Sequence, residues 1–104
     1  GMMGALEENP EEETLLFEIA YFYEELGQQD ECIKYYNKFL DENPYSYNGW
    51  YNLGITYSKL DLFEKAIDCY AKAIEIFPDN ELAQQGLKIA NERINDIESS
   101  ENIF

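Results

Sequence analysis

Residues 47–80, YNGWYNLGITYSKLDLFEKAIDCYAKAIEIFPDN, carry the strongest pattern in this 104-residue chain. In the first half, four residues spaced by three, one and three positions share one face of a helix. These are Trp50, Leu53, Gly54 and Tyr57. In the second half, a wide apolar stripe recurs at the helical period and stops before Pro78, which has no amide proton to continue a helix. The stretch therefore predicts a helical hairpin with helices at about 47–60 and 63–76.

The same pattern occurs earlier in the chain, at a period of 34 residues. Pro10, Pro44 and Pro78 are separated by this interval, and residues 13–46 align without gaps on 47–80. Identical pairs in the alignment include Tyr23 with Tyr57, Ile33 with Ile67, and Tyr36 with Tyr70. A hairpin repeated at this period predicts an all-α fold of stacked antiparallel helical hairpins.

The hairpin resembles the repeat unit of the tetratricopeptide family. The family pattern W-x2-L-G-x2-Y, then A-x3-[FY], A and P, is filled by Trp50, Leu53, Gly54, Tyr57, Ala66, Tyr70, Ala73 and Pro78. The resemblance covers about residues 5–94 and implies an α-α superhelix, a right-handed solenoid of such hairpins. Gly54 and Ala66 are expected to face each other where the two helices of the hairpin approach closely.

The chain is organised around two complete units. We predict a first repeat at 13–46 and a second at 47–80, preceded at 1–12 by the remnant of an earlier repeat helix. A further apolar stripe predicts a capping helix at 81–97, and the tail at 98–104 is expected to be flexible. Two readings of the N-terminal remnant stay open: a piece cut from a longer array, or a short segment that leaves the first hairpin partly uncovered.

Charge and composition exclude several classes of function. Seven Lys and Arg against 22 Asp and Glu give a net charge of -15, so we expect no nucleic-acid binding. Without histidine there is no Ser-His or Cys-His pair, and Cys32 and Cys69 lie in apolar patterns typical of buried free thiols. The sequence shows neither an apolar run of about 20 residues nor a signal peptide. We expect a cytoplasmic protein that is not an enzyme and uses no cofactor, metal or membrane.

The resemblance implies a function in protein binding. In such proteins extended peptides lie on the concave surface, which the first helix of each repeat lines. Carried over to this chain, the peptide-binding groove comprises Thr14, Phe17, Glu18, Tyr21, Glu24, Asn48, Tyr51, Asn52, Ile55, Ser58, Gln85 and Ile89, with Leu82 and Glu92 beside them. Four apolar members are expected to lie off the stripe that packs each hairpin and to form a contact patch, namely Phe17, Tyr21, Tyr51 and Ile55. The alternative is that they pack against one another or against a covering segment.

Asn52 has two readings. Many family members hold a peptide backbone through an asparagine at this position, whose amide both donates and accepts; the alternative is a solvent-facing polar residue. The clamp that chaperone-binding members use for a terminal carboxylate is otherwise missing. Its other positions are held by Phe17 and Tyr21, or by Tyr51 and Ile55, and by Leu82 and Gly86.

The expected partner is a protein or peptide with apolar or aromatic anchors and basic flanks, because acidic residues lie near the groove. The alternative function is self-association as a homodimer. The uncovered face of the first hairpin carries Leu15 and Phe22, and short repeat stacks gain stability from a neighbour.

Overall fold

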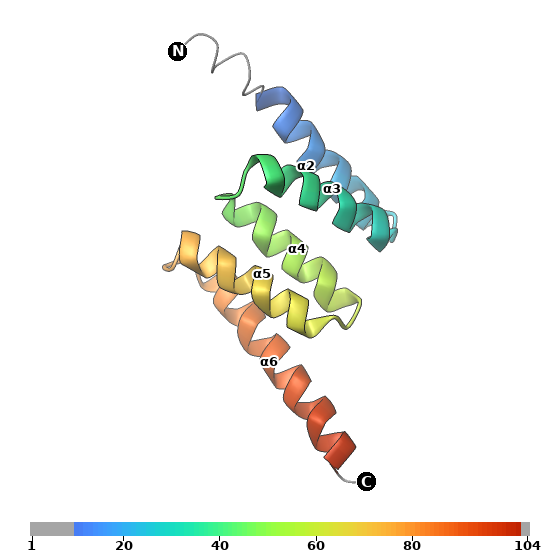
Figure 1. The fold of residues 1–104 in the computed structure, drawn as a ribbon, viewed down its shortest axis with the longest axis vertical. Helices are drawn as coiled ribbons and strands as arrows, with labels where there is room; N and C mark the ends of the chain where they lie inside the picture. The colour runs from blue at the N-terminus through green and yellow to red at the C-terminus, as the bar shows by residue number, and fades with distance from the viewer. Residues whose placement is uncertain (1–9, 103–104) are drawn as a thin grey trace. The chain divides into compact units, whose positions relative to one another are not determined.

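The computed structural model describes residues 10–102, and the side chains of residues 15–100. This described part consists of five helices joined by short turns (Figure 1). They are α2 (Pro10–Glu25), α3 (Gln29–Glu42), α4 (Tyr47–Lys59), α5 (Phe63–Ile76) and α6 (Glu81–Asn102). The contacts divide the chain into two compact units, one ending at Tyr45 and the other beginning at Ser46. The first unit holds the α2–α3 hairpin, and the second holds the α4–α5 hairpin with α6 packed on α5. The prediction of an all-α fold built from helical hairpins is confirmed.

The helices of the second hairpin lie where the sequence pattern predicts them. α4 begins after Ser46, whose hydroxyl oxygen accepts a hydrogen bond from the amide of Gly49 at 3.1 Å. This bond satisfies one of the amides that the first turn of a helix leaves without a partner. α5 ends at Ile76, since Pro78 disfavours the helical conformation at Phe77.

α2 and α4 end in the same kind of turn. The amide of Gln28 after α2 and that of Leu62 after α4 donate to carbonyls five residues earlier, at 3.0 and 2.9 Å. This is the Schellman motif, in which the residue before the donor adopts a positive φ. That residue is Gly27 in the first hairpin, with φ 77°, and Asp61 in the second, with φ 61°. The second hairpin therefore carries a side chain in a backbone conformation that favours glycine.

The first helix begins earlier than predicted. α2 starts at Pro10, so residues 10–12 form its first turn and do not belong to the end of a preceding repeat helix. Proline fits the first helical position because the amide there needs no partner within the helix. The rest of the predicted N-terminal remnant, residues 1–9, lies outside the described residues.

The last helix is longer than predicted. α6 continues to Asn102, beyond the predicted end of the capping helix at Ile97, so residues 98–102 of the predicted tail are helical. Neither glycine nor proline follows Gly86, and so nothing in the sequence ends the helix earlier. In Figure 1 the C-terminal part of α6 extends past the turn between α4 and α5. Residues 103–104 lie outside the described part.

Aromatic and small residues fill the first hairpin. Ala20, Cys32 and Tyr36 are fully buried. The ring of Phe17 packs edge-on against the rings of Tyr36 and Phe39, with centroid distances of 5.5 and 5.3 Å. These contacts join α2 to α3 through side chains that leave water on folding.

Alanines bring α6 close to the second hairpin. Ala83 and Ala90 of α6 are fully buried in one cluster with Ala66, Tyr70 and Ala73 of α5. Small side chains at these positions let the two helix backbones approach each other. Both cysteines, Cys32 and Cys69, are buried free thiols, as predicted. No helix within the described residues has the length and apolar character of a membrane span.

Candidate peptide-binding surface

Tyr70 of α5 lies beneath both α4 and α6. A Cβ added at Gly54 of α4 would come within 2.8 Å of the Tyr70 ring, and one added at Gly86 of α6 within 2.6 Å. The ring therefore occupies space that only glycine leaves on either side. Gly54 was predicted to face Ala66, and that contact stays a prediction; the atoms nearest to an added Cβ belong to this ring, because the tyrosine extends from α5 between the two neighbouring helices.

The hydroxyl of Tyr70 shares a hydrogen bond of 3.3 Å with the hydroxyl of Ser58 on α4. Burial raises the pKa of Tyr70 above its ordinary value of 10.0, although the hydrogen bond with Ser58 acts in the opposite direction. The phenol thus stays neutral at physiological pH and keeps its proton as a hydrogen-bond donor.

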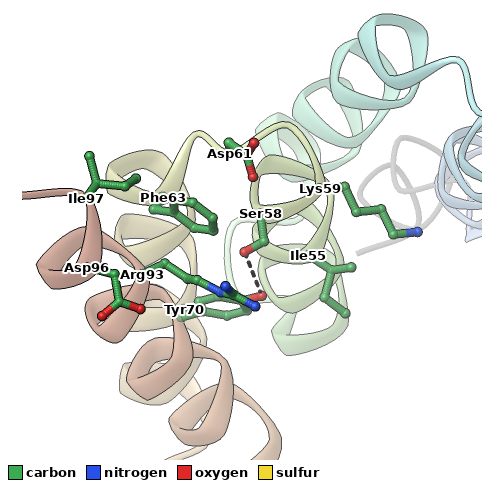
Figure 2. A pocket seen from close by; sticks show the side chains of 9 residues that line it. All are labelled: Ile55, Ser58, Lys59, Asp61, Phe63, Tyr70, Arg93, Asp96 and Ile97. Atoms are coloured by element: carbon green, nitrogen blue, oxygen red, sulfur yellow. Dashed lines mark hydrogen bonds between the residues drawn. The ribbon is translucent and has the colours of Figure 1, made fainter. Parts of the chain in front are cut away.

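A pocket of about 620 Å³ opens beside these two hydroxyls (Figure 2). Apolar and charged side chains from three helices and one turn line it. They are Ile55, Ser58 and Lys59 of α4, Asp61 of the turn, Phe63 and Tyr70 of α5, and Arg93, Asp96 and Ile97 of α6. Figure 2 shows the side chain of Arg93 extending from α6 toward the hydroxyls of Ser58 and Tyr70. The site thus joins α4 and α6 within the second unit.

Only some of the predicted α4 residues reach the pocket. Ile55 and Ser58 line it, whereas Tyr51 stacks on Tyr47 at a centroid distance of 5.9 Å and lies 6.1 Å from the ring of Tyr70. Both Tyr51 and Ile55 are half-buried and pack against the buried cluster of the second unit. The prediction that they lie off the packing stripe is therefore wrong, because the Tyr70 ring reaches far enough between the helices to contact this face of α4.

Asn48 and Asn52 of α4 lie nearer its start. Asn48 is exposed, and Asn52 is half-buried. The backbone carbonyl of Asn52 accepts a hydrogen bond from the Thr56 hydroxyl at 3.1 Å. Within the described residues its side-chain amide forms no hydrogen bond, so that group is available to a ligand.

The predicted residues of α6 form an exposed face. Leu82 and Ile89 are 50% and 54% exposed, and Gln85 and Glu92 are exposed with them. These four recur every three or four positions, which places them on one side of the helix. Arg93, one turn after Ile89, continues that side into the pocket.

The predicted α2 residues belong to the first unit. Phe17, Glu18 and Tyr21 line a shallow pocket of about 460 Å³ together with Phe22 and Glu25. Phe17 also packs on α3, so it too lies on the packing stripe, contrary to prediction. The carboxylate of Glu24 accepts a long hydrogen bond, 3.9 Å, from the Cys32 thiol. The side chain of Thr14 lies outside the described ones.

Sequence reasoning missed all four charged residues that line the pocket between α4 and α6. Lys59 and Arg93 occupy the same position of the repeat, 34 residues apart, and both line it. Extending the groove pattern by one residue beyond Ser58 and Glu92 would have found them. Asp61, Asp96 and Ile97 had no such signal, because their place in the pocket depends on how the turn between α4 and α5 lies beside α6.

Comparison with protein families identifies one kind of repeat. Two family models, each described as a tetratricopeptide repeat, match residues 47–80 and residues 13–56. The first has the bounds of the predicted second repeat.

Relatives of known identity match through a small part of their length. The chain is 32% identical over 73 residues to human Superkiller complex protein 3. This match covers 70% of the chain and 5% of that protein. It is 38% identical over 58 residues to Tetratricopeptide repeat protein 37 of Xenopus laevis, covering 56% of the chain and 4% of that protein. The chain thus spans about 5% of the length of these relatives.

Solved structures share the fold at low sequence identity. The Arabidopsis OM64 TPR domain superposes with a TM-score of 0.78 at 19% identity, covering 83% of this chain and 71% of that one. The first TPR of Spaghetti (RPAP3), solved with the HSP90 peptide SRMEEVD, gives 0.76 at 23% identity, covering 86% and 73%. At these identities the likeness shows the fold alone.

Proposed function

Because the chain belongs to the tetratricopeptide repeat family, whose domains are protein–protein interaction modules, we propose that it binds a segment of a partner protein and catalyses no reaction. The binding site proposed is the α4–α6 surface. Its members are Asn48, Asn52, Ile55 and Ser58 of α4, and Leu82, Gln85, Ile89 and Arg93 of α6. The observation that carries the proposal is the pocket that α4 and α6 share, next to the exposed apolar residues of α6.

Apolar anchors in the partner are supported by Leu82 and Ile89. They lie seven residues apart on one side of α6, and each leaves about half of its surface in water. Covering such side chains is favourable by about 25 cal/mol per Å² of apolar surface. An aliphatic or aromatic residue of the partner would gain this free energy on contact.

Basic flanks in the partner are supported by the net charge of -15. Such a charge attracts a cationic segment at long range and speeds its association. The free amide of Asn52 adds a group that both donates to and accepts from a peptide backbone. The contacts predicted for Phe17, Glu18 and Tyr21 of α2 remain a separate prediction.

A peptide-display selection on the immobilised chain tests this function. We expect enriched peptides that carry an apolar residue, and about tenfold or greater loss of their affinity in the double variant Leu82→Ser, Ile89→Ser. Tyr45→Ser is the matched control, since Tyr45 is 83% exposed and lies between α3 and α4. Enriched peptides that bind the double variant as tightly as the unmodified chain would place the site elsewhere.

Self-association is the second candidate function. Leu15 and Phe22 of α2 are 52% and 57% exposed and lie seven residues apart, and Leu26 is exposed one turn further. A second copy of the chain could cover this apolar stripe by packing the same stripe against it.

Light scattering between micromolar and millimolar concentration tests that candidate. We expect the mass to rise toward that of a dimer, and the double variant Leu15→Ser, Phe22→Ser to stay monomeric over the same range. A monomer at every concentration of the unmodified chain would rule the dimer out.

A further inference from the structure

Basic side chains are concentrated in the pocket between α4 and α6. The chain has seven Lys and Arg among 104 residues, and two of the seven, Lys59 and Arg93, line this pocket. Arg93 is the only arginine of the sequence. Among the described residues, no carboxylate oxygen lies within 4.0 Å of its guanidinium nitrogens, which is the limit for an ion pair. The pocket thus offers an uncommitted guanidinium in an otherwise acidic protein.

A hydroxyl proton is available beside the guanidinium. Ser58 and Tyr70 together carry two hydroxyl protons, and the hydrogen bond between them uses one. Tyr70 is 4% exposed, whereas Ser58 is half-buried and faces the pocket. When Tyr70 donates to Ser58, the Ser58 proton is free to point into the pocket. Arg93 and Ser58 then form two donors from opposite walls.

Three apolar side chains line the pocket beside these donors. Ile55, Phe63 and Ile97 supply hydrocarbon surface from α4, α5 and α6. A ligand group that fits this lining has an apolar body next to an acceptor of two hydrogen bonds. A carboxylate matches a guanidinium in both geometry and charge, and Asp and Glu carry one in a protein segment.

We propose that this pocket is a subsite for an acidic side chain, Asp or Glu, that neighbours an apolar residue in the bound protein segment. The apolar residue packs on Ile55, Phe63 and Ile97, and the carboxylate accepts from the Arg93 guanidinium and the Ser58 hydroxyl. This inference rests on the proposed function. It adds one acidic residue to a partner segment whose flanks are proposed to be basic.

Two carboxylates of the protein limit the strength of this subsite. Asp61 and Asp96 also line the pocket and repel a ligand carboxylate. Because Arg93 is exposed, its pairing contributes modestly, and we expect a preference of about two- to fivefold for an acidic over an uncharged ligand. The same reasoning predicts that removing one carboxylate strengthens the preference.

Three synthetic peptides test the subsite by NMR titration of the ¹⁵N-labelled full chain. Each is a capped eight-residue peptide of glycine and serine with a central pair, either Phe-Glu, Phe-Gln or Phe-Lys. We expect the Phe-Glu peptide to bind about two- to fivefold more tightly than Phe-Gln, with Phe-Lys the weakest, and to shift the amides of Ser58 and Arg93.

Charge variants assign the preference to Arg93. Arg93→Gln should reduce the ratio of Phe-Glu to Phe-Gln affinity to about one, and Asp96→Asn should raise it by about twofold or more. Lys88→Gln is the matched control, because Lys88 is an exposed basic residue of the same helix that does not line the pocket. It removes the same charge and should leave the ratio unchanged.

Two outcomes would overturn the subsite. If Phe-Glu and Phe-Gln bind equally, or if Arg93→Gln keeps the preference, the pocket does not recognise a carboxylate; the proposed function then still stands on Phe-Gln binding. If none of the peptides shifts Ser58 or Arg93 at millimolar concentration, the subsite is absent. The display selection with the Leu82→Ser, Ile89→Ser variant then judges the proposed function separately.

Discussion

In both hairpins an aromatic ring lies next to a tyrosine at the same pair of repeat positions, but different residues pack around the two pairs. Phe17 packs on Tyr36 at 5.5 Å in the first hairpin, and Tyr51 lies 6.1 Å from Tyr70 at the same repeat positions in the second. In the first hairpin the Phe39 ring also contacts Phe17.

In the second hairpin alanine occupies the repeat position of Phe39, and α6 packs there. Ala73 lies in one buried cluster with Ala83 and Ala90 of α6. The Tyr70 ring then reaches between Gly54 and Gly86, and its hydroxyl meets Ser58 at the pocket. The comparison teaches that the repeat pattern builds each hairpin, whereas the pocket depends on residues particular to the second unit.

Removing the Tyr70 ring should break the second unit most severely. Tyr70→Ala deletes a buried ring between two helices and should lower the free energy of unfolding by about 3–5 kcal/mol. Urea unfolding followed by circular dichroism measures the loss. The control Tyr45→Ala removes an exposed ring and should stay within about 0.5 kcal/mol of the unmodified chain. Small losses of equal size in both variants would contradict the conclusion that the buried Tyr70 ring stabilises the second unit.

Alkaline pH should weaken the second unit next. Burial, with a smaller contribution from Asp68, raises the pKa of Cys69 from 9.0 to about 12. The unfolded chain therefore loses this proton before the folded chain does, so the stability from Cys69 is complete below pH 9 and falls as the pH rises toward 12. The slope is about 1.4 kcal/mol per pH unit, or about 2 kcal/mol between pH 9 and 10.5.

Urea unfolding at pH 8 and 10.5 measures this decline. The raised pKa of Tyr70 acts in the same direction, above about pH 10. In the variant Cys69→Ala the decline should become shallower, because the buried thiol at this position no longer contributes to the difference between the two states. An identical decline in the variant would show that Cys69 does not lose its proton on unfolding.

Adding a methyl group above Tyr70 should cost less. Gly54→Ala and Gly86→Ala each place a Cβ within 3.0 Å of the ring, and relieving such overlap costs about 1–3 kcal/mol. The higher helix propensity of alanine offsets about 1 kcal/mol of this cost, so the free energy of unfolding should fall by about 1 kcal/mol. Thermal unfolding measures it. A rise in the melting temperature would contradict the fit of the ring, even though Ala20 is accepted at the Gly54 position of the first hairpin.

Exchanging the two turn residues should have the smallest effect. Asp61 and Gly27 occupy the same positive-φ position, where glycine avoids a cost that side chains carry. Asp61→Gly should raise the free energy of unfolding by about 0.5–1 kcal/mol, and Gly27→Asp should lower it by a similar amount. Melting temperatures compare the pair. Shifts of the same sign in both variants would contradict the equivalence of the turns.

The sequence predicted the hairpins because their determinants are local. The 34-residue period, the apolar stripes and Pro78 determine where α4 and α5 begin and end. The end of α6 was predicted wrongly because it has no local determinant: no residue after Gly86 breaks a helix. Pro10 was misread because proline fits both the turn after a helix and the first turn of one.

The pocket could be predicted only in part because it depends on packing between helices. Gly86 occupies the repeat position of Asn52, and so the repeat pattern gave no reason to pair it with Gly54 around one ring. Ile55 and Ser58 were identified from their position on α4. Arg93 lies one residue beyond the predicted groove pattern, whereas Asp96 was missed because it reaches the pocket only where α6 lies beside the turn at Asp61.

Chemical-shift mapping with a display-selected peptide tests the central claim most directly, that the α4–α6 surface binds a protein segment. Titration of the ¹⁵N-labelled chain should shift the amides of Asn52, Ser58, Ile89 and Arg93 most strongly and leave the amides of α3 unchanged. Shifts confined to the stripe of Leu15 and Phe22 on α2, or to the exposed residues Ala71, Lys72 and Glu75 of α5, would contradict it.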